Sequence, residues 1–313
     1  MKLLVIGGAG YIGSHVCKEL LKQGHQVTVF DNLSTGLKEN ILPSATFIEG
    51  DILFTDQLDS AMSGQEVVVH LAAFKAAGES MTNPCGTINI FNSMCRAGVN
   101  KIIFSSSAAV YGEPQYLPLD ENHPTEPVNY YGFTKLEIER ILKWYSQLKG
   151  IRFAALRYFN AVGYDHEGEL RGLEKNPQNL LPIVMEAISG KREKLQVFGD
   201  DYPTDDGTCI RDYIHVDDLS SAHAKALDYL TEKNKDLVVN LATGQGLSVK
   251  DIITEAKKQS GVDFTVEIVA RRPGDPAKLY AGNALAKELL DWQPQYSGLE
   301  TIVSTTLRAY GLK

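Results

Sequence analysis

The sequence is poor in cysteine, has no long hydrophobic run and carries no excess of positive charge. Its 313 residues include only four cysteines, Cys17, Cys85, Cys95 and Cys209, and none has the Cys-x-x-Cys spacing typical of zinc or redox motifs. We therefore expect neither a metal site nor a disulfide scaffold. No stretch approaches the roughly 20 apolar residues that a membrane-spanning helix needs, so no membrane partner is expected.

The charge balance argues against binding to a polyanion. Thirty-one Lys and Arg oppose 39 Asp and Glu, which gives a net charge of −8, and a surface this acidic does not attract nucleic acid in general. Residues 1–6 run directly into a glycine loop, an apolar stretch too short for a signal peptide. We therefore expect a cytoplasmic protein that does not bind nucleic acid.

Short apolar runs alternate with helix-length segments, and no repeat or low-complexity segment interrupts them. A helix is expected at residues 12–23, ending at Gly24. The runs that we expect to form buried strands are residues 3–6, 26–30, 46–48, 67–71, 101–105, 153–157 and 238–241. This alternation predicts an α/β fold with a Rossmann-like, doubly wound parallel sheet.

The pattern loosens after residue 160. Residues 165–179 and 200–212 are polar and are expected to form long loops. Helices are expected at 181–189, 249–259 and 284–290, the last two in a smaller C-terminal α/β region. We expect a nucleotide-binding domain in residues 1–160, to which the chain returns around 207–243, and a smaller domain in 161–313.

A glycine-rich loop connects the first expected strand to the first helix. Gly7, Gly10 and Gly13 follow the Gly-x-x-Gly-x-x-Gly spacing, which allows a tight turn and close approach of the backbone to a pyrophosphate. The helix N-terminus then offers free amides to an anion. Asp31 ends the second strand, where a carboxylate binds ribose hydroxyls and disfavours a 2′-phosphate. The pattern therefore favours NAD over NADP, the alternative being a glycine turn with an unrelated aspartate.

A Tyr-x-x-x-Lys pair, Tyr131 and Lys135, follows a run of three serines at residues 105–107. On a helix, positions i and i+4 share one face, so the phenol and the ammonium point into the same space. A neighbouring ammonium favours the phenolate, which makes tyrosine a usable base near neutral pH. Taken alone, such a pair is more often an ordinary surface pair, and the surrounding motifs carry the functional interpretation.

These motifs occur together in one family. With them, the block Arg211–Val216 makes the chain similar, nearly end to end, to the extended short-chain dehydrogenase/reductase family, and within it to the nucleotide-sugar 4-epimerases. The blocks that carry the resemblance are residues 7–15, 31–33, 50–52, 70–80, 104–112, 131–135, 156–163, 201–217 and 271–275.

The resemblance implies an isomerase that uses NAD and acts on UDP-hexoses. It implies 4-epimerisation of UDP-galactose and UDP-glucose through a transient 4-keto sugar, and it leaves the N-acetylated pair UDP-GalNAc and UDP-GlcNAc open. Ser107 would bind the sugar 4-oxygen, Tyr131 would take its proton, and Lys135 would hold the nicotinamide ribose and lower the tyrosine pKa. Residues 1–160 would bind NAD, and residues 161–313 would bind the UDP-sugar.

The resemblance also assigns the contacts of both ligands. The positions implied for NAD are Gly7, Gly10, Tyr11, Ile12, Gly13, Asp31, Asn32, Asp51, Ile52, Lys75, Tyr131, Lys135 and Tyr158. The positions implied for the UDP-sugar are Lys75, Ser107, Tyr131, Asn160, Asn179, Leu180, Phe198, Arg211, Arg272 and Asp275. His215, in the same block as Arg211, is expected to be structural.

The chain departs from the family pattern after Pro84. The stretch before Thr87 is shorter than usual and lacks an asparagine that resembles a cofactor contact, so a helix is expected only over residues 87–97. That helix contributes to the family's dimer interface, and a homodimer is therefore an open expectation. Leu279 falls where a side chain limits sugar size in the family. A tyrosine there selects plain hexoses, smaller residues admit N-acetyl sugars, and leucine is intermediate in size.

Three alternatives remain at this stage. A nucleotide-sugar 4,6-dehydratase needs an extra acid and base after the serine run, where this chain has Ala108 and Ala109. A uronate epimerase or decarboxylase needs a cation for the sugar carboxylate, which the sequence does not locate. A non-catalytic NAD-binding regulator typically loses the tyrosine or the lysine, and both are retained here.

Overall fold

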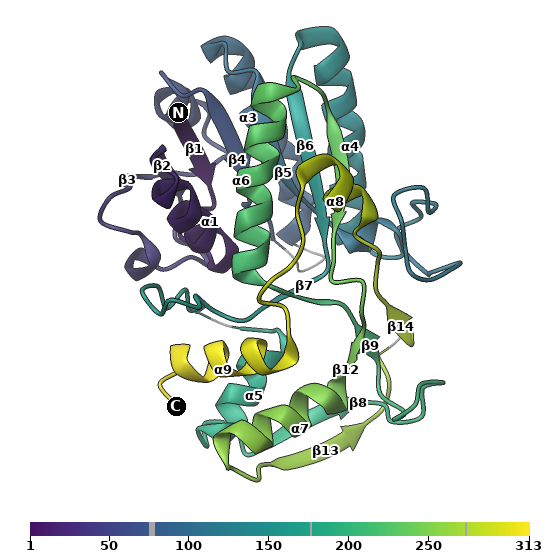
Figure 1. Ribbon diagram of the computed structural model, residues 1–313. Coiled ribbons are helices and arrows are strands. Elements are labelled where there is room, and N and C mark those ends of the chain that lie inside the picture. The colour runs from purple at the N-terminus through teal and green to yellow at the C-terminus, as the bar shows by residue number, and fades with distance from the viewer. Residues whose placement is uncertain (75–78, 176, 273) are drawn as a thin grey trace.

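The protein is built around a parallel β-sheet, seen from one side in Figure 1. The computed structural model describes residues 1–74, 79–175, 177–272 and 274–313. The strands of the main sheet are β1 (Lys2–Ile6), β2 (Gln26–Asp31), β3 (Thr46–Glu49), β4 (Val67–His70), β5 (Lys101–Ser107), β6 (Arg152–Tyr158) and β11 (Leu237–Leu241). Within the described ranges these seven strands are all parallel, in the order β11-β6-β5-β4-β1-β2-β3. The predicted Rossmann-like, doubly wound sheet is confirmed.

Helices cover both faces of this sheet. The helices are α1 (Tyr11–Lys22), α2 (Thr55–Met62), α3 (Asn83–Ala97), α4 (Tyr130–Lys149), α5 (Leu180–Ile188), α6 (Val216–Glu232), α7 (Val249–Ser260), α8 (Ala284–Leu290) and α9 (Leu299–Ala309), with 3₁₀ turns η1 (Lys38–Asn40), η2 (Glu79–Thr82) and η3 (Ala108–Val110). One buried cluster joins α1, α6 and α8 to one face. A second joins α2, α3 and α4 to the other. Alternate residues of each strand enter opposite clusters, as the two-residue period of a strand requires.

A smaller layer lies below the carboxyl ends of the main strands in Figure 1. Its core joins α5, α7 and α9 to a parallel pair, β8 (Lys194–Phe198) and β13 (Thr265–Val269). The connections between the two layers carry short strands: β7 (Asn160–Val162) pairs with β10 (Tyr213–His215), and β9 (Ile210–Arg211) lies between β12 (Leu247–Ser248) and β14 (Lys278–Leu279). None of the described helices combines the length and apolarity that crossing a membrane requires.

The helix after the fourth strand begins earlier than predicted. The sequence placed its start at Thr87, but α3 starts at Asn83 and has 15 residues. The prediction was wrong because Pro84 lies in the first turn, where the missing amide costs no helical hydrogen bond. A Cβ on Gly86 would lie 2.3 Å from the side chain of Ile52, so this glycine allows close packing against the neighbouring chain and does not end the helix.

Two further features differ from the expectation or were missed. The expected helix 284–290 is present as α8, but Ala286 and Leu290 pack into the core on the main sheet and not into the smaller layer. The patterns of α6 and α9 were not recognised. Residues 237–241 return to the sheet as predicted, because β11 pairs with β6 at its edge.

Candidate functional site

A cleft lies at the carboxyl ends of β1, β2, β3 and β4, where open α/β sheets commonly bind nucleotides. Its lining comprises Ile6, Gly7, Gly10, Phe30, Asp31, Asn32, Ser34, Thr35, Gly50, Asp51, Ile52, Leu53, Leu71, Ala72, Ala73, Phe74, Thr82 and Asn83. The cleft therefore brings together six of the positions expected to bind NAD, namely Gly7, Gly10, Asp31, Asn32, Asp51 and Ile52.

The glycine loop forms one wall of this first cleft. Gly7 has a φ of 85°, and a Cβ on it would lie 2.7 Å from the amide nitrogen of Ala72. A Cβ on Gly13 would lie 2.1 Å from the carbonyl oxygen of Gly7. Because α1 begins at Tyr11, the amides of its first turn have no acceptor within the helix. The glycines therefore permit a tight turn, and the start of α1 offers free donors to a diphosphate.

Asp31 fixes the end of β2 against the glycine loop. One carboxyl oxygen accepts the Ala9 amide at 3.0 Å and the other accepts the Leu33 amide at 2.8 Å. Burial raises the pKa of Asp31, and these two hydrogen bonds oppose the rise. Nearby, the Asn32 side chain donates to Asp51 at 2.9 Å. The two carboxyl groups are thus held in fixed positions on the cleft wall, where ribose hydroxyls could donate to them.

The serine run and the Tyr-x-x-x-Lys pair meet at the carboxyl end of β5. The Lys135 ammonium donates to the Ser105 carbonyl oxygen at 2.7 Å and lies 5.6 Å from the centre of the Tyr131 ring. The hydroxyl of Ser107 accepts the Ala109 amide at 3.2 Å, and its interaction with the Tyr131 phenol favours the phenolate. Ser107, Tyr131 and Lys135 thus form one group, as the sequence predicted.

The pKa of the phenol differs from the sequence-based expectation. Burial raises the pKa of Tyr131 to about 12, and its hydrogen bond with Ser107 opposes the rise. The expectation was a pKa lowered by Lys135, but without NAD the effect of burial on the phenol is larger. A base at this position therefore needs a further positive charge beside the phenol to act near neutral pH.

A second cleft opens between the main sheet and the smaller layer. It is lined by Asn160, Ala161, Val162, Gln178, Asn179, Leu180, Ile183, Leu195, Gln196, Val197, Phe198, Gly199, Cys209, Arg211, Tyr213, Val249, Arg272 and Asp275. Seven positions expected to bind the UDP-sugar lie in it, namely Asn160, Asn179, Leu180, Phe198, Arg211, Arg272 and Asp275. They come from five separate segments of the chain.

Cationic and aromatic groups converge in this second cleft. The Arg272 guanidinium lies 3.9 Å from the centre of the Phe198 ring, a cation–π arrangement that holds both side chains in place. Arg211 forms an ion pair with Asp275. Guanidinium groups match phosphate oxygens in geometry and charge, so the cleft has the chemistry of a nucleotide diphosphate site.

Comparisons with known proteins agree with this architecture. The sequence profile of the NAD dependent epimerase/dehydratase family matches residues 3–242. The chain belongs to this family. It is 44% identical to a UDP-glucose 4-epimerase of Halalkalibacterium halodurans over 314 residues, which covers 97% of this chain and 93% of the relative.

Solved structures of the same family share the fold throughout. The crystal structure of UDP-glucose 4-epimerase from Brucella ovis in complex with NAD is 42% identical, with a TM-score of 0.96, and covers 100% of this chain and 99% of that chain. The UDP-Glc/GlcNAc 4-epimerase from Campylobacter jejuni is also 42% identical, with a TM-score of 0.84 and 99% coverage of both chains.

Some positions expected from the epimerase/dehydratase resemblance lie outside the two clefts. Lys75 falls outside the described residues. The Tyr11 hydroxyl donates to the Gly163 carbonyl oxygen at 2.5 Å, and Ile12 packs against the main core. Tyr158 bonds the Ser105 hydroxyl below the site, and burial raises its pKa well above the ordinary value. A role of these side chains in binding NAD stays a prediction.

Other residues of the site were missed by the sequence analysis. Asn83 lines the first cleft, and its side-chain amide exchanges two hydrogen bonds of 2.9 Å with the backbone of Phe74. Glu139 and Arg157 form a buried ion pair directly below the serine run. The Asn-Pro sequence at Asn83 was a usable signal for the first. Nothing in the sequence distinguishes Glu139 from the exposed charges of the same helix.

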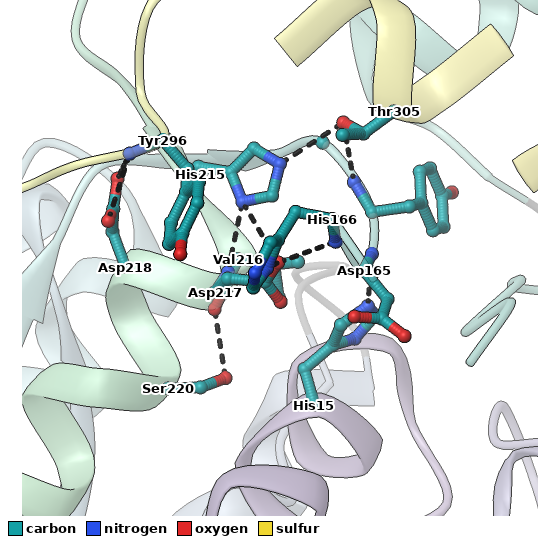
Figure 2. Close-up of polar contacts among 12 residues, drawn as sticks. His15, Asp165, His166, His215, Val216, Asp217, Asp218, Ser220, Tyr296 and Thr305 are labelled. Atoms are coloured by element: carbon teal, nitrogen blue, oxygen red, sulfur yellow. Dashed lines mark hydrogen bonds and ion pairs between the residues drawn. The ribbon is translucent and has the colours of Figure 1, made fainter. Parts of the chain in front are cut away.

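A cluster of histidines and carboxylates joins α1, α6 and the smaller layer (Figure 2). His15 accepts the Asp165 amide, and the side chain of His166 bonds Asp217 at 2.8 Å. His215 accepts the Asp217 amide and contacts Thr305, and burial lowers its pKa to about 4, in keeping with a structural role.

Ligand atoms of Asp165, His166 and Asp217 lie within 4.8 Å of one another. Both carboxyl oxygens of Asp165 accept backbone amides, and one also bonds the Lys18 ammonium. A cation there would meet a carboxylate whose acceptor positions are in use and a like charge beside it. We therefore infer that this cluster has a structural role and holds the main sheet and the smaller layer together.

Asp212 should make the unfolding free energy depend on pH. Burial raises its pKa from 3.8 to about 6, although the Thr243 amide and hydroxyl each donate to it at 3.0 Å. The pKa of this carboxyl is higher in the folded than in the unfolded chain. Its contribution to the free energy of unfolding is therefore fully present below pH 4 and is lost as pH rises through 6, by up to about 3 kcal/mol. Asp212→Asn is expected to have a lower free energy of unfolding than the wild type at pH 4. Because the amide does not titrate, this difference should narrow as pH rises to 6, as measured by urea titrations.

The matched control is Asp205→Asn, an exposed change in the loop between β8 and β9. It should follow the wild-type stability curve at each pH. A deficit of Asp212→Asn that stays constant from pH 4 to pH 7 would contradict the assignment.

Proposed function

We propose that the protein is an NAD-dependent UDP-hexose 4-epimerase that interconverts UDP-galactose and UDP-glucose. The meeting of Ser107, Tyr131 and Lys135 at the end of β5 carries the proposal. In the sheet order, β5 stands between β4, which borders the first cleft, and β6, which leads to Asn160 in the second. A sugar attached to a nucleotide in the second cleft would reach this group.

The first cleft fits NAD. A Cβ at Gly7 or Gly13 would clash with backbone atoms of Ala72 or of the loop itself, so the tight loop beside the cleft requires glycine there, and Asp31 offers carboxylate oxygens to ribose hydroxyls. Asn32, Asp51 and the other lining positions named above would complete the contacts. The epimerase of Brucella ovis, whose fold is the same, was crystallised with NAD.

The chain's own residues would orient the sugar and move one proton. Bound NAD would accept the hydride that leaves C4 of the sugar, and it would add a positive charge next to Tyr131. The Ser107 hydroxyl would hold the 4-oxygen, and the Tyr131 phenolate would take the 4-hydroxyl proton while C4 is oxidised to the ketone. Tyr131 would return the proton when hydride is delivered to the opposite face. Lys135, held by the Ser105 carbonyl oxygen, would stabilise the phenolate.

The substrate would be held mainly by its nucleotide part. Asn160, Asn179, Leu180 and Phe198 would contact the uridine and sugar, and Arg211, Arg272 and Asp275 would hold or position the diphosphate. Firm binding of UDP with a loosely held sugar permits the 4-keto sugar to rotate in the cleft. This rotation is what separates epimerisation from simple oxidation.

The alternatives fit the site less well. Ala108 and Ala109 form η3 directly after Ser107, so this turn offers neither the acid nor the base that a 4,6-dehydratase needs there. Retention of the tyrosine and the lysine in one group disfavours a regulator. The named relatives are UDP-glucose 4-epimerases over nearly the full chain.

The deciding experiment measures interconversion of UDP-galactose and UDP-glucose by purified protein, with and without added NAD. Turnover without added cofactor would support an epimerase that retains NAD. Turnover only with added NAD would support the same reaction with weaker cofactor binding near α3. A lack of turnover in both conditions, with NAD shown to bind, would refute the proposal.

The residue at position 279 bears on whether N-acetylated sugars are also substrates. Leu279 is half-buried in β14, next to Tyr280 and opposite Arg211 in the pairing with β9. A leucine leaves more room than a tyrosine, and a relative named UDP-Glc/GlcNAc 4-epimerase is 42% identical. We propose that UDP-GlcNAc is also a substrate, and undetectable turnover of it at high enzyme concentration would end this extension.

Arg272→Met should weaken substrate binding without slowing the chemical step. Loss of one guanidinium from a phosphate contact is expected to raise KM for UDP-galactose about tenfold, with kcat nearly unchanged. Arg271→Met is the matched control, because Arg271 stacks on Tyr202 and bonds Asp201 outside the cleft. An equal rise in KM for both variants would contradict the assignment of Arg272.

The organisation into domains and subunits also stands as a proposal. Residues 1–160 with 207–243 would form the NAD-binding domain, and the rest of 161–313 would bind the UDP-sugar, with α8 added to the first core. We propose a homodimer through α3 and α4, where Trp144 and Leu148 are 62% and 72% exposed. Light scattering at micromolar concentration tests this, since a monomer mass would refute it.

A further inference from the structure

The three serines at the end of β5 bond three residues of different kinds around them. Ser105 accepts the Lys135 ammonium at its carbonyl oxygen, and the Ser107 hydroxyl interacts with the Tyr131 phenol and opposes the rise of its pKa. The Ser106 hydroxyl donates to Glu139 at 2.5 Å. Tyr131, Lys135 and Glu139 follow one another at intervals of four on α4 and so share one helix face. The middle serine is thus tied to the helix that carries the proton-transfer residues.

The carboxylate of Glu139 is itself held by a cation on the next strand. Arg157, on β6, donates to its two oxygens at 2.9 Å and 2.6 Å. Glu139 is 1% and Arg157 5% exposed. Burial alone would lower the pKa of Arg157, but its hydrogen bonds and charge interaction with Glu139 raise it overall, so the guanidinium keeps its charge.

The same guanidinium also holds the chain beyond Ser107. Arg157 donates to the Tyr111 hydroxyl at 3.1 Å and lies 5.0 Å from the centre of that ring. The Tyr111 hydroxyl in turn donates to Asn240 of β11 at 2.6 Å. The segment 106–111, which contains Ser107 and the η3 turn, is therefore fixed at both ends to one buried ion pair.

A buried ion pair needs a reason, because well-packed apolar residues of similar volume stabilise a core at least as well. Here the geometry supplies one. The pair connects three elements, α4, β5 and β6, exactly where an error in their relative position would separate Ser107 from Tyr131. Displacement of catalytic groups by a fraction of an ångström is sufficient to slow a proton transfer.

We propose that Ser106, Glu139 and Arg157 are positioning residues for the epimerase reaction, which clamp the segment 106–111 so that Ser107 stays aligned with Tyr131 and Lys135. The inference rests on the proposed function. It extends that function to groups that touch neither the sugar nor the cofactor.

The test is Ser106→Ala, which removes one hydroxyl and leaves the ion pair intact. Because the clamp acts on alignment, kcat should fall about tenfold, while KM for UDP-galactose stays within about twofold, since the nucleotide contacts lie on other elements. The limb of the kcat–pH profile that reports the base should move to higher pH, because the phenol loses part of its alignment with Ser107. Ser106→Thr retains the hydroxyl and should restore both values.

The matched control is Ser146→Ala, on α4 like Glu139, whose hydroxyl bonds Asp236 away from the serine run. It should keep the wild-type kcat and pH profile. A purely structural role of Ser106 would lower the melting temperature but leave kcat and the pH profile of the folded enzyme unchanged, and this result would overturn the proposal.

A second readout does not depend on turnover. Amide hydrogen exchange over residues 106–111 should be faster in Ser106→Ala than in the wild type or in Ser146→Ala. Unchanged exchange would overturn the clamp even if the wild type were found to act on no UDP-hexose. A wild type without turnover but with faster exchange in Ser106→Ala would refute the proposed function and retain the clamp.

Discussion

Tyr131→Phe is expected to lower kcat by about 10³-fold, the usual contribution of a general base that takes and returns a proton. The change removes a hydroxyl that interacts with Ser107 and keeps the half-buried ring in place beside Lys135. Because the two clefts are formed by other residues, NAD retention and KM should change little. The measurements are the rate of UDP-galactose conversion and the NAD released from denatured protein.

Tyr130→Phe provides the matched control on the preceding residue. Tyr130 is 37% exposed, and its ring contacts Phe133 at the surface. This variant should keep wild-type turnover. If Tyr131→Phe retained more than a tenth of wild-type kcat, Tyr131 would not be the base, and the reaction would need another proton acceptor.

Gly13→Ala should remove the ability to retain NAD. The new Cβ would lie 2.1 Å from the Gly7 carbonyl oxygen and 2.8 Å from the Gly8 Cα. These are backbone atoms that cannot rotate away, so the backbone of the loop at Gly7 and Gly8 must shift away from the first turn of α1. Overpacking of this kind costs about 1–3 kcal/mol, and if that cost falls on the bound loop, NAD affinity falls roughly 10- to 100-fold. Isothermal titration with NAD measures the loss directly.

Gly298→Ala tests whether the effect is specific to the loop. Gly298 precedes α9 with a φ of −70°, and a Cβ there would meet no atom within 4 Å. This variant should bind NAD as the wild type does. Wild-type affinity in Gly13→Ala would show that the glycine loop does not hold the diphosphate.

The sequence predicted the main sheet because its strands have a simple physical pattern. The run Val67–Val69 is apolar at every position, which is typical of a parallel strand covered on both faces. The glycine loop and Asp31 were predictable for the same reason, since their spacing along one βαβ unit determines their distance in space.

The second cleft could not have been assembled from spacing alone. Asn160, Asn179 and Arg272 lie far apart in the chain, and only the resemblance to a family placed them together. Glu139 was missed for a different reason. On a helix of mixed charge, a glutamate is normally exposed, and its burial depends on Arg157, which reaches it from another strand. Tertiary partners of this kind leave no local trace.

The start of α3 shows the limit of local rules. Asn-Pro and Cys-Gly both resemble a loop, yet the helix runs through them because Gly86 packs against Ile52. The misplaced start made the helix appear shorter than it is. The raised pKa of Tyr131 was missed for a related reason, since its main cause is burial of the phenol, which depends on tertiary packing.

The position of β11 has a consequence for synthesis of the chain. β6 ends at Tyr158, but the strand that covers its outer edge begins only at Leu237. Until that strand leaves the ribosome, β6 is a largely apolar edge with unpaired backbone groups, which is a form of sheet prone to join a neighbouring chain. The edge of β6 is therefore covered only once β11 has been synthesised. A chain truncated before Leu237 would be expected to aggregate, although it contains the whole glycine loop and the Ser107–Tyr131–Lys135 group.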